Sequence, residues 1–239
     1  MLGRTMAVFT EVSFAEASAL VARLGVGALQ QLTGIASGIE NSNYFADTSA
    51  ARLVLTVFER LGRSELPFYL GLMRHLAERG LPVPRPLAAA SGELLHTLCG
   101  KPAAVTLRLV GAPQLQPSAA QGESVATALA RLHLAGRDYP HTQPNPRGLT
   151  FWTENAPWLG PLLPEPARGL LAQELMLQQQ LAASDAYAAL PRGATHGDLF
   201  RDNVLFEGTQ LSGLLDFYFA STDTFLFDIA VCLNDWCTD

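Results

Sequence analysis

Three side chains in the last fifth of the sequence have the types and the spacing that phosphoryl transfer requires. Asp198 and Asn203 lie five residues apart, and Asp216 follows after a further stretch. An alcohol that attacks a phosphoryl group must be held in line and must lose its proton, so a carboxylate is needed within hydrogen-bond reach; Asp198 is the candidate. Magnesium prefers oxygen ligands, so Asn203 and Asp216 are its candidate ligands. The segment predicts a kinase that uses ATP and Mg²⁺.

A predicted hairpin makes the two candidate metal ligands credible as a pair. Residues 204–206 and 211–215 are apolar in the manner of strands, and Gly208-Thr209 lies between them as a turn. A hairpin places its two ends side by side. Asn203 and Asp216 can therefore converge although they are thirteen positions apart in the chain.

A stretch with two glycines, residues 34–43, is a candidate for covering the phosphates. Glycines four positions apart let the backbone turn sharply and aim N–H groups at an anion. The stretch matches neither common phosphate-loop pattern, so an ordinary hairpin turn is the alternative interpretation. The candidate nucleotide contacts within it are Gly34, Ser37, Gly38, Asn41, Ser42 and Asn43.

The elements that precede residue 110 predict a small α+β lobe. Ser13 and Glu16 fit a capping box before an amphipathic helix that stops at Gly25, and a second helix is expected from Ser64 to Gly80. Strand-like segments give an antiparallel five-stranded sheet. We expect a nucleotide-binding lobe over residues 1–110, with strands near 29–32, 43–46, 53–58, 94–98 and 103–110.

The remainder, residues 111–239, is expected to form a mostly helical catalytic and substrate lobe. Gly111-Ala112-Pro113 is the predicted hinge, residues 118–135 and about 167–182 predict helices, and the proline-rich residues 136–166 predict loop with short helical pieces. A last helix begins near Phe225 and is still amphipathic at Trp236. We expect a chain truncated at its C-terminus, with apolar side chains of that helix partly uncovered.

Composition narrows the partners to small molecules. Hydrophobic residues make up 49% of the chain, charged residues 16%, and the net charge is -6, which disfavours a nucleic-acid binder. The three cysteines show no metal-binding or disulfide spacing, and no apolar run is long enough for a bilayer span. A cytoplasmic protein with no membrane partner is expected.

Longer strings in the sequence resemble a known family. His196-Gly197-Asp198 with Asn203 and Asp216 has the form of the catalytic-loop pattern shared by protein kinases and aminoglycoside-phosphotransferase-like kinases. The fuller strings resemble the homoserine kinases of that protein-kinase-like superfamily; they are Glu40-Asn41-Ser42-Asn43-Tyr44-Phe45, Leu132-His133, residues 196–203 and Leu215-Asp216-Phe217-Tyr218. The resemblance runs from about Met6 to Trp236 and implies a two-lobed kinase-like fold.

The resemblance also implies an activity and leaves two alternatives open. It implies ATP-dependent phosphorylation of the side-chain hydroxyl of L-homoserine, giving O-phospho-L-homoserine in threonine biosynthesis. The alternatives are a kinase for another small amino alcohol or an aminoglycoside, and an inactive nucleotide-binding pseudokinase. A substrate panel with detection of ADP would separate them.

One departure from the family pattern concerns phosphate charge. Such kinases commonly carry a cation on the third strand, where this chain has Thr56, and the sole lysine, Lys101, is expected in a hairpin turn elsewhere. Arg201 is therefore predicted to reach the transferred phosphoryl group or the substrate carboxylate.

Other polar residues near the motif are expected to have structural roles. His196 is predicted to tie the loop backbone, His133 to be a packed core histidine, and Asp228 to cap a helix or brace the catalytic loop. Tyr218 and Asp235 could contact the substrate, with packing or solvent exposure as the alternative.

Overall fold

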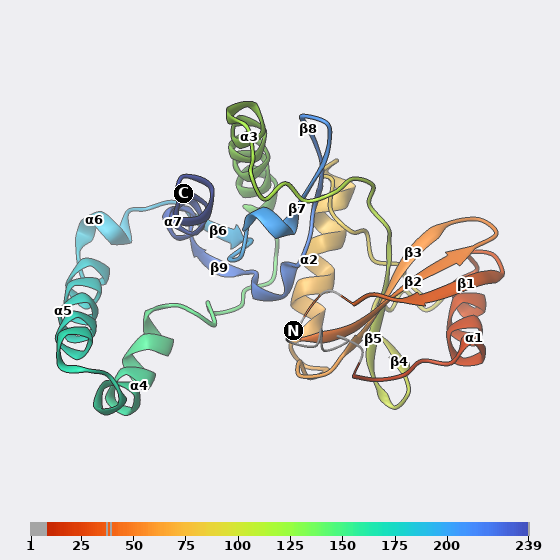
Figure 1. Ribbon diagram of the computed structural model, residues 1–239, viewed down its shortest axis with the longest axis horizontal. Helices are drawn as coiled ribbons and strands as arrows, with labels where there is room; N and C mark the ends of the chain where they lie inside the picture. The colour runs from red at the N-terminus through yellow and green to blue at the C-terminus, as the bar shows by residue number, and fades with distance from the viewer. Residues whose placement is uncertain (1–8, 37, 39, 239) are drawn as a thin grey trace, which may run out of the picture. The chain divides into compact units, whose positions relative to one another are not determined.

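The computed structural model describes residues 9–36, 38 and 40–238 and resolves them into two compact units (Figure 1). The first unit runs to Leu132 and also includes Arg201–Leu215. The second unit comprises His133–Phe200 and the residues from Asp216 onwards. The chain is an α+β protein, as expected.

An antiparallel sheet forms the centre of the first unit. Its strand order is β1-β2-β3-β5-β4, which confirms the predicted five-stranded sheet. Cross-strand partners share a face, so the rows Tyr44–Leu55 and Asn43–Thr56 lie on opposite faces. The strands are β1 (Leu29–Gly34), β2 (Asn41–Thr48), β3 (Arg52–Phe58), β4 (His96–Leu98) and β5 (Lys101–Leu107).

Helix α1 (Phe14–Leu24) covers the face of the sheet that carries Tyr44 and Leu55. The predicted capping box is present, and Gly25 ends the helix at φ 67°, a left-handed conformation that glycine adopts without strain. Leu20 and Val21 of α1 pack with that face in one apolar cluster, and α1 lies beside β1 in Figure 1. Burying side chains of this size stabilises the unit by about 1.5–3 kcal/mol each.

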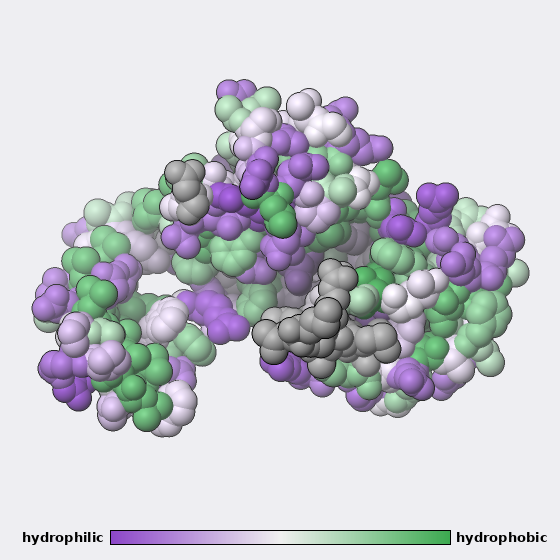
Figure 2. Space-filling view, in the orientation of Figure 1, coloured by the Kyte–Doolittle hydropathy of each residue, from purple (hydrophilic) through white to green (hydrophobic). Residues whose placement is uncertain are grey.

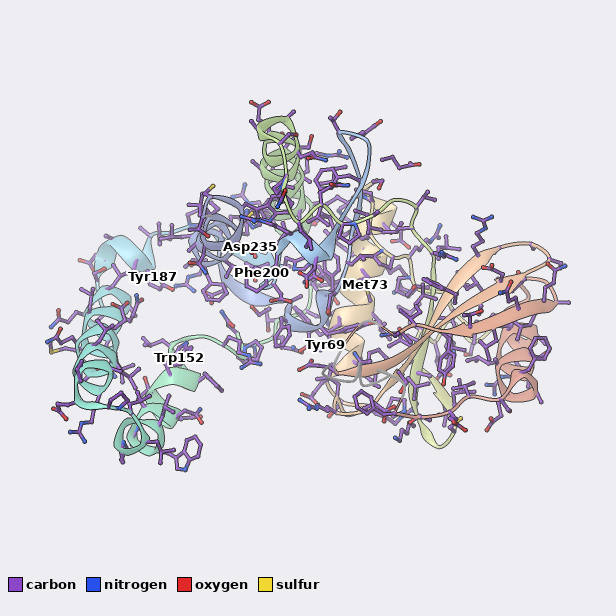
Figure 3. All side chains as sticks on the ribbon, in the orientation of Figure 1. Tyr69, Met73, Trp152, Tyr187, Phe200 and Asp235 are labelled. Carbon is purple, nitrogen blue, oxygen red and sulfur yellow. The ribbon has the colours of Figure 1, made fainter. Side chains whose placement is uncertain are left out.

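Helix α2 (Leu66–Glu78) and a hairpin also belong to the first unit. Pro67 lies in the first turn of α2, as predicted, and Tyr69 and Met73 follow one turn apart and are buried (Figure 3). The hairpin consists of β7 (Val204–Glu207) and β8 (Gln210–Leu214). The predicted hinge segment runs along this hairpin, because Ala112 forms a two-bond bridge with Phe206.

The second unit is mostly helical with one short sheet. Two short strands, β6 (Arg192–Thr195) and β9 (Ser221–Thr224), pair in an antiparallel ladder that the sequence did not predict. Helix α3 (Ala119–Gly136) enters this unit at His133. The remaining helices are α4 (Leu149–Leu159), η1 (Gly160–Leu162), α5 (Glu165–Ala182), α6 (Asp185–Ala188), η2 (Arg201–Asn203, in the first unit), η3 (Phe217–Phe219) and α7 (Phe225–Trp236).

Helices α4 and α5 bury none of their described side chains. The loop with short helical pieces that was expected over residues 136–166 contains α4 and η1, and Pro157 is accommodated near the C-terminal end of α4. Apolar side chains appear on the surface of this region in Figure 2; the largest are Trp152 and Trp158 of α4, Leu162 of η1, and Leu170, Met176, Leu177 and Leu181 of α5. Among the described helices, none combines the length and the apolar character that a bilayer span requires.

Helix α7 also exposes apolar surface. Ile229 is 41% exposed and Leu233 53% exposed, in line with the expectation of uncovered side chains there. The three cysteines, Cys99, Cys232 and Cys237, are free thiols. Burial, together with nearby acidic groups, raises the pKa of the Cys232 thiol to about 12, so it stays protonated and unreactive near neutral pH.

Candidate active site

The hairpin predicted between the two candidate metal ligands is present as β7 and β8. Val204 pairs with Leu214, and the Leu215 N–H donates to the Asn203 carbonyl at 2.8 Å. Asp216 is the next residue in the chain after Leu215. The hairpin therefore holds the backbone of Asn203 against the residue that precedes Asp216.

Asp216 has a backbone conformation that few residues other than glycine adopt. Its φ and ψ are 57° and 67°, in the left-handed region. Such a conformation costs an L-residue about 1–2 kcal/mol, and residues held in this way cluster at functional sites. The strained backbone and the exposed carboxylate support a functional role for Asp216.

Asp198 lies in a short loop of the second unit that is fixed on both sides. The preceding strand β6 pairs with β9, and the following Leu199 is fully buried with its carbonyl accepting from Trp236 Nε1 at 2.9 Å. The Asp198 N–H donates to His196 Nδ1 at 3.3 Å. This contact confirms that the His196 ring ties the loop backbone.

Asp228 braces the same loop from α7. Its carboxylate is buried and accepts the N–H groups of His196 and Gly197, each at 2.8 Å, and it lies 2.9 Å from His133 Nε2. Of the two predicted roles, the structure therefore supports bracing of the loop. His133 is a buried histidine, as predicted, and its ring stacks on Phe225 with centroids 4.3 Å apart.

The protonation state of Asp228 follows from these contacts. Burial alone would raise its pKa, but the hydrogen bond from His133, the charge of His196 and the two backbone N–H donors hold the pKa below the ordinary value. Asp228 is therefore a carboxylate throughout the neutral range. A buried anion with four stabilising interactions gives the loop a single, well-defined conformation.

Gly197 is required by the shape of this loop. Its φ is +78°, and a Cβ at this position would lie 2.6 Å from the Phe219 carbonyl oxygen. We expect Gly197→Ala to lower the free energy of unfolding by about 2 kcal/mol or more. The alanine must adopt a left-handed conformation, and the backbone near Phe219 must also move to make room for the Cβ atom. Chemical denaturation measures the change.

Gly208→Ala is the matched control for that prediction. Gly208 also has a positive φ, +63°, but no atom lies within 4 Å of its Cβ position. Its cost should be the conformational one alone, about 1 kcal/mol. Equal losses in the two variants would show that the close approach to Phe219 has no energetic consequence.

The glycine stretch of the first unit brings Gly38, Asn43 and Thr56 together. Thr56 donates to Asn43 Oδ1 at 2.8 Å, and a Cβ on Gly38 would lie 3.6 Å from Asn43 Nδ2. Gly34 and Gly38 are exposed, whereas Asn41 is buried at 9% exposure. Ser37 lies outside the described residues. Thr56 therefore orients Asn43 at the position where related kinases carry a cation.

Ser42 faces the other side of the sheet. Its buried hydroxyl accepts the N–H groups of Phe9 and Thr10 and donates to Glu59. Successive side chains of a strand point to opposite faces, so Asn41 and Asn43 share one face and Ser42 does not. Ser42 thus holds the chain at residues 9–10, and of the candidate phosphate contacts in β2 Asn41 and Asn43 share the opposite face.

Lys101 begins strand β5 instead of lying in the hairpin turn. The turn consists of Cys99 and Gly100, both with positive φ, and Leu98 pairs with Lys101 across it. The parity of β5 places Lys101 on the face of Ala103 and Val57, opposite to Thr56. Its ammonium binds Glu59, so the sole lysine does not replace the missing strand cation in this conformation.

Comparison with known proteins adds a decisive observation. Residues 31–239 match the model of the phosphotransferase enzyme family. The chain belongs to this family. It is 57% identical over 234 residues to a homoserine kinase of Polaromonas naphthalenivorans, covering 98% of this chain and 74% of that protein. It is 48% identical to a homoserine kinase of Janthinobacterium sp., covering 98% of this chain and 73% of the relative.

Solved structures of phosphotransferases share the fold. An amicoumacin kinase in complex with AMP-PNP, Ca²⁺ and Ami superposes with a TM-score of 0.71 at 17% identity, covering 92% of this chain and 69% of that one. A macrolide 2'-phosphotransferase from Brachybacterium faecium gives 0.61 at 18% identity, covering 93% and 77%. The fold is that of the protein-kinase-like phosphotransferases, and this family member transfers a phosphoryl group to a hydroxyl acceptor.

The donor set of this phosphotransferase fits a hard divalent cation. Asn203 and Asp216 offer an amide oxygen and a carboxylate, and Mg²⁺ usually takes such ligands together with phosphate and water oxygens. Within the described residues no group of three or more His, Cys, Asp or Glu side chains is arranged so that it could hold a metal ion. The bound nucleotide would have to supply part of the coordination.

The three remaining candidates are Arg201, Tyr218 and Asp235. Arg201 donates from Nη1 to the Leu115 carbonyl at 3.2 Å in the first unit. Asp235 lies on α7 of the second unit, and Phe200 is labelled beside Asp235 in Figure 3. The next residue of α7, Trp236, donates to the Leu199 carbonyl. Tyr218 and Asp235 are both half-buried.

Proposed function

We propose that this phosphotransferase is an ATP-dependent homoserine kinase of the cytoplasm. It would convert L-homoserine to O-phospho-L-homoserine in threonine biosynthesis. The observation that carries the proposal is the 57% identity to a homoserine kinase over 98% of the chain. The braced Asp198 loop and the hairpin that follows Asn203 support the proposal.

The reaction assigns one role to each candidate residue. The homoserine hydroxyl oxygen forms a bond to the γ-phosphorus of ATP, the bond from that phosphorus to the β-phosphate bridging oxygen breaks, and ADP leaves with the electron pair. Asp198 orients the hydroxyl and accepts its proton. Asn203 and Asp216 would hold Mg²⁺, which neutralises charge on the β- and γ-phosphates when bound.

The glycine stretch is proposed to cover the phosphates. Gly34 and Gly38 expose backbone, and the Asn43 amide is oriented by Thr56. Asn41 lies on the same face of β2 as Asn43. Hydrogen bonds from neutral donors at these positions would supply part of the phosphate stabilisation that a strand lysine supplies in related kinases.

Arg201 is proposed to contact the transferred phosphoryl group or the substrate carboxylate. In the structure one of its N–H groups binds the Leu115 carbonyl, so a reach toward the substrate requires this contact to be exchanged. We expect Arg201→Ala to lower kcat/KM about 10-fold to 100-fold, the loss of one charge-assisted contact. Steady-state kinetics with homoserine and with ATP measure it, and unchanged kcat and KM values would contradict the role.

The function is tested by the release of ADP. The chain is supplied with Mg²⁺-ATP and, in separate reactions, L-homoserine, L-serine, L-threonine, ethanolamine, choline and an aminoglycoside. Homoserine should give the highest kcat/KM, with phosphorylated product detected by mass spectrometry. Preference for another acceptor would make the protein a kinase for that substrate, and nucleotide binding without ADP release for any acceptor would identify an inactive pseudokinase.

A further inference from the structure

The N-terminal strap, defined as residues 9–12, is tied to strand β2 by four hydrogen bonds. The Phe9 and Thr10 N–H groups donate to Ser42 Oγ at 2.8 and 2.9 Å. The Tyr44 hydroxyl donates to the Thr10 carbonyl at 2.6 Å and accepts from the Val12 N–H at 3.1 Å. The strap is therefore held by Ser42 and Tyr44, two of the β2 side chains that point to the face covered by α1.

A charged pair anchors the same point. Lys101 Nζ lies 2.5 Å from Glu59 Oε2 and donates to Thr10 Oγ1 at 2.8 Å, and the other Glu59 oxygen accepts from Ser42 Oγ at 2.6 Å. The Glu59 side chain is only 11% exposed. Burial would raise its pKa, but the contacts with Lys101, Ser42 and Thr10 lower it below the ordinary value. In this network Lys101 binds Thr10, which is 91 positions away in the chain, and Glu59, which is 42 positions away. No local sequence pattern indicates these contacts.

Ser42 links this network to the candidate nucleotide loop. It stands between Asn41 and Asn43 in β2, and the alternation of the strand turns those two side chains to the opposite face. Fixing the Ser42 hydroxyl therefore fixes the direction of its two neighbours. In addition, the strap residues Glu11 and Val12 share a cavity of about 530 Å³ with Gly34 and Ala36 at the start of the loop.

We propose that Glu59 and Lys101 are positioning residues for nucleotide binding, which act through Ser42 and the strap on the orientation of Asn41, Asn43 and the loop that begins at Gly34. The proposal rests on the assignment of this loop to the phosphates in the proposed function. Neither residue contacts the nucleotide, because both lie on the face of the sheet opposite to Asn43. Their effect should appear in the affinity for nucleotide and not in the handling of the acceptor.

The experiment measures binding of Mg²⁺ and AMP-PNP by calorimetry, together with KM for ATP and for homoserine. In Lys101→Met the buried Glu59 carboxylate loses its cation, and we expect Kd for AMP-PNP and KM for ATP to rise about tenfold, as for a lost charged contact. KM for homoserine should stay within about twofold. Lys101→Met with Glu59→Gln should bind more tightly than Lys101→Met alone, because no unpaired charge remains.

Matched variants keep the test decisive. Arg63→Met removes another cation at the same sheet, which binds the carbonyl of His96 and the hydroxyl of Thr97, and should leave Kd unchanged. Thr10→Val removes only the strap hydroxyl and serves if Lys101→Met does not fold; its Kd should rise about threefold, as for a lost neutral hydrogen bond.

Two results would overturn the proposal. One is an unchanged Kd in folded Lys101→Met, or in Thr10→Val where Lys101→Met does not fold. The other is an equal rise of both KM values, which would indicate general loss of structure. If the wild-type chain binds AMP-PNP but phosphorylates no homoserine, the proposed function fails while the Kd comparison still tests the positioning roles.

Discussion

Replacing Asp198 with Asn is expected to lower kcat for homoserine phosphorylation by about 10² to 10⁴-fold, the usual contribution of a positioned general base. Asn has the same shape but cannot accept a proton from the acceptor hydroxyl. The loop should survive the change, because its hydrogen bonds come from the backbone of Asp198 and from Asp228, not from the Asp198 side chain alone. Coupled detection of ADP measures kcat, and calorimetry should give a Kd for AMP-PNP within about twofold of wild type.

Asp202→Asn is the matched control for that variant. Asp202 is an exposed carboxylate in the same segment, in the short helix η2, and it has no assigned role. Its removal should leave kcat within about twofold. Equal activity of the wild-type and Asp198→Asn chains would eliminate the general-base mechanism, and equal losses in both variants would point to a nonspecific charge effect.

Replacing Asp228 with Asn is expected to cost about 3 kcal/mol of unfolding free energy, within the range for breaking a buried charged network. Asn can accept from fewer of the three donors, and its amide group would face one of the N–H groups of His196 or Gly197. Without the brace the Asp198 loop loses its fixed conformation, so kcat should also fall. Thermal unfolding should show a drop of about 6–12 °C.

The free energies of unfolding of wild type and Asp228→Asn should differ most above the pH range in which Asp228 titrates. The pKa of Asp228 is lower in the folded protein than in the unfolded chain, so its contribution is complete above the unfolded value of about 4. It is lost as the pH falls through the folded value. The difference in unfolding free energy between wild type and Asp228→Asn should therefore shrink below about pH 4.

Asp185→Asn provides the reference for the Asp228 prediction. Asp185 is an exposed carboxylate at the first position of α6 in the same unit, and its replacement should cost less than about 1 kcal/mol. A loss of the same size in Asp228→Asn would mean that the buried network does not stabilise the catalytic loop.

Local sequence patterns predicted much of the fold and the hairpin between the candidate site residues. Ser13, Glu16 and Gly25 determine both ends of α1 through contacts within a few residues, and the β7–β8 hairpin follows from two apolar runs and a short turn. The spacing of Asp198 and Asn203 singled out the candidate catalytic segment. Each of these signals is short-range, which is why the sequence alone expresses it.

Long-range pairing accounts for what the sequence did not predict. The polar strand β9 forms only because β6 lies opposite, and Thr195 and Ser221, paired across them, are 26 positions apart. The prediction that Lys101 lies in a turn was wrong. The turn consists of Cys99 and Gly100, one residue earlier, because Cys99 adopts a positive φ that its residue type does not signal. The sequence also did not predict the role of Ser42, because no nearby residue indicates that its hydroxyl binds the N–H groups of Phe9 and Thr10.

The single lysine of this chain gives a chemical handle. Reagents that acylate amines, such as succinimidyl esters, have one side-chain target besides the α-amino group of the chain; it is Lys101, whose side chain is 43% exposed. The ammonium held by Glu59 must lose its proton and its partner before it reacts, so labelling is slow while the pair is closed. The rate of modification at this one position therefore reports how often the contact with Glu59 opens, without any engineered probe.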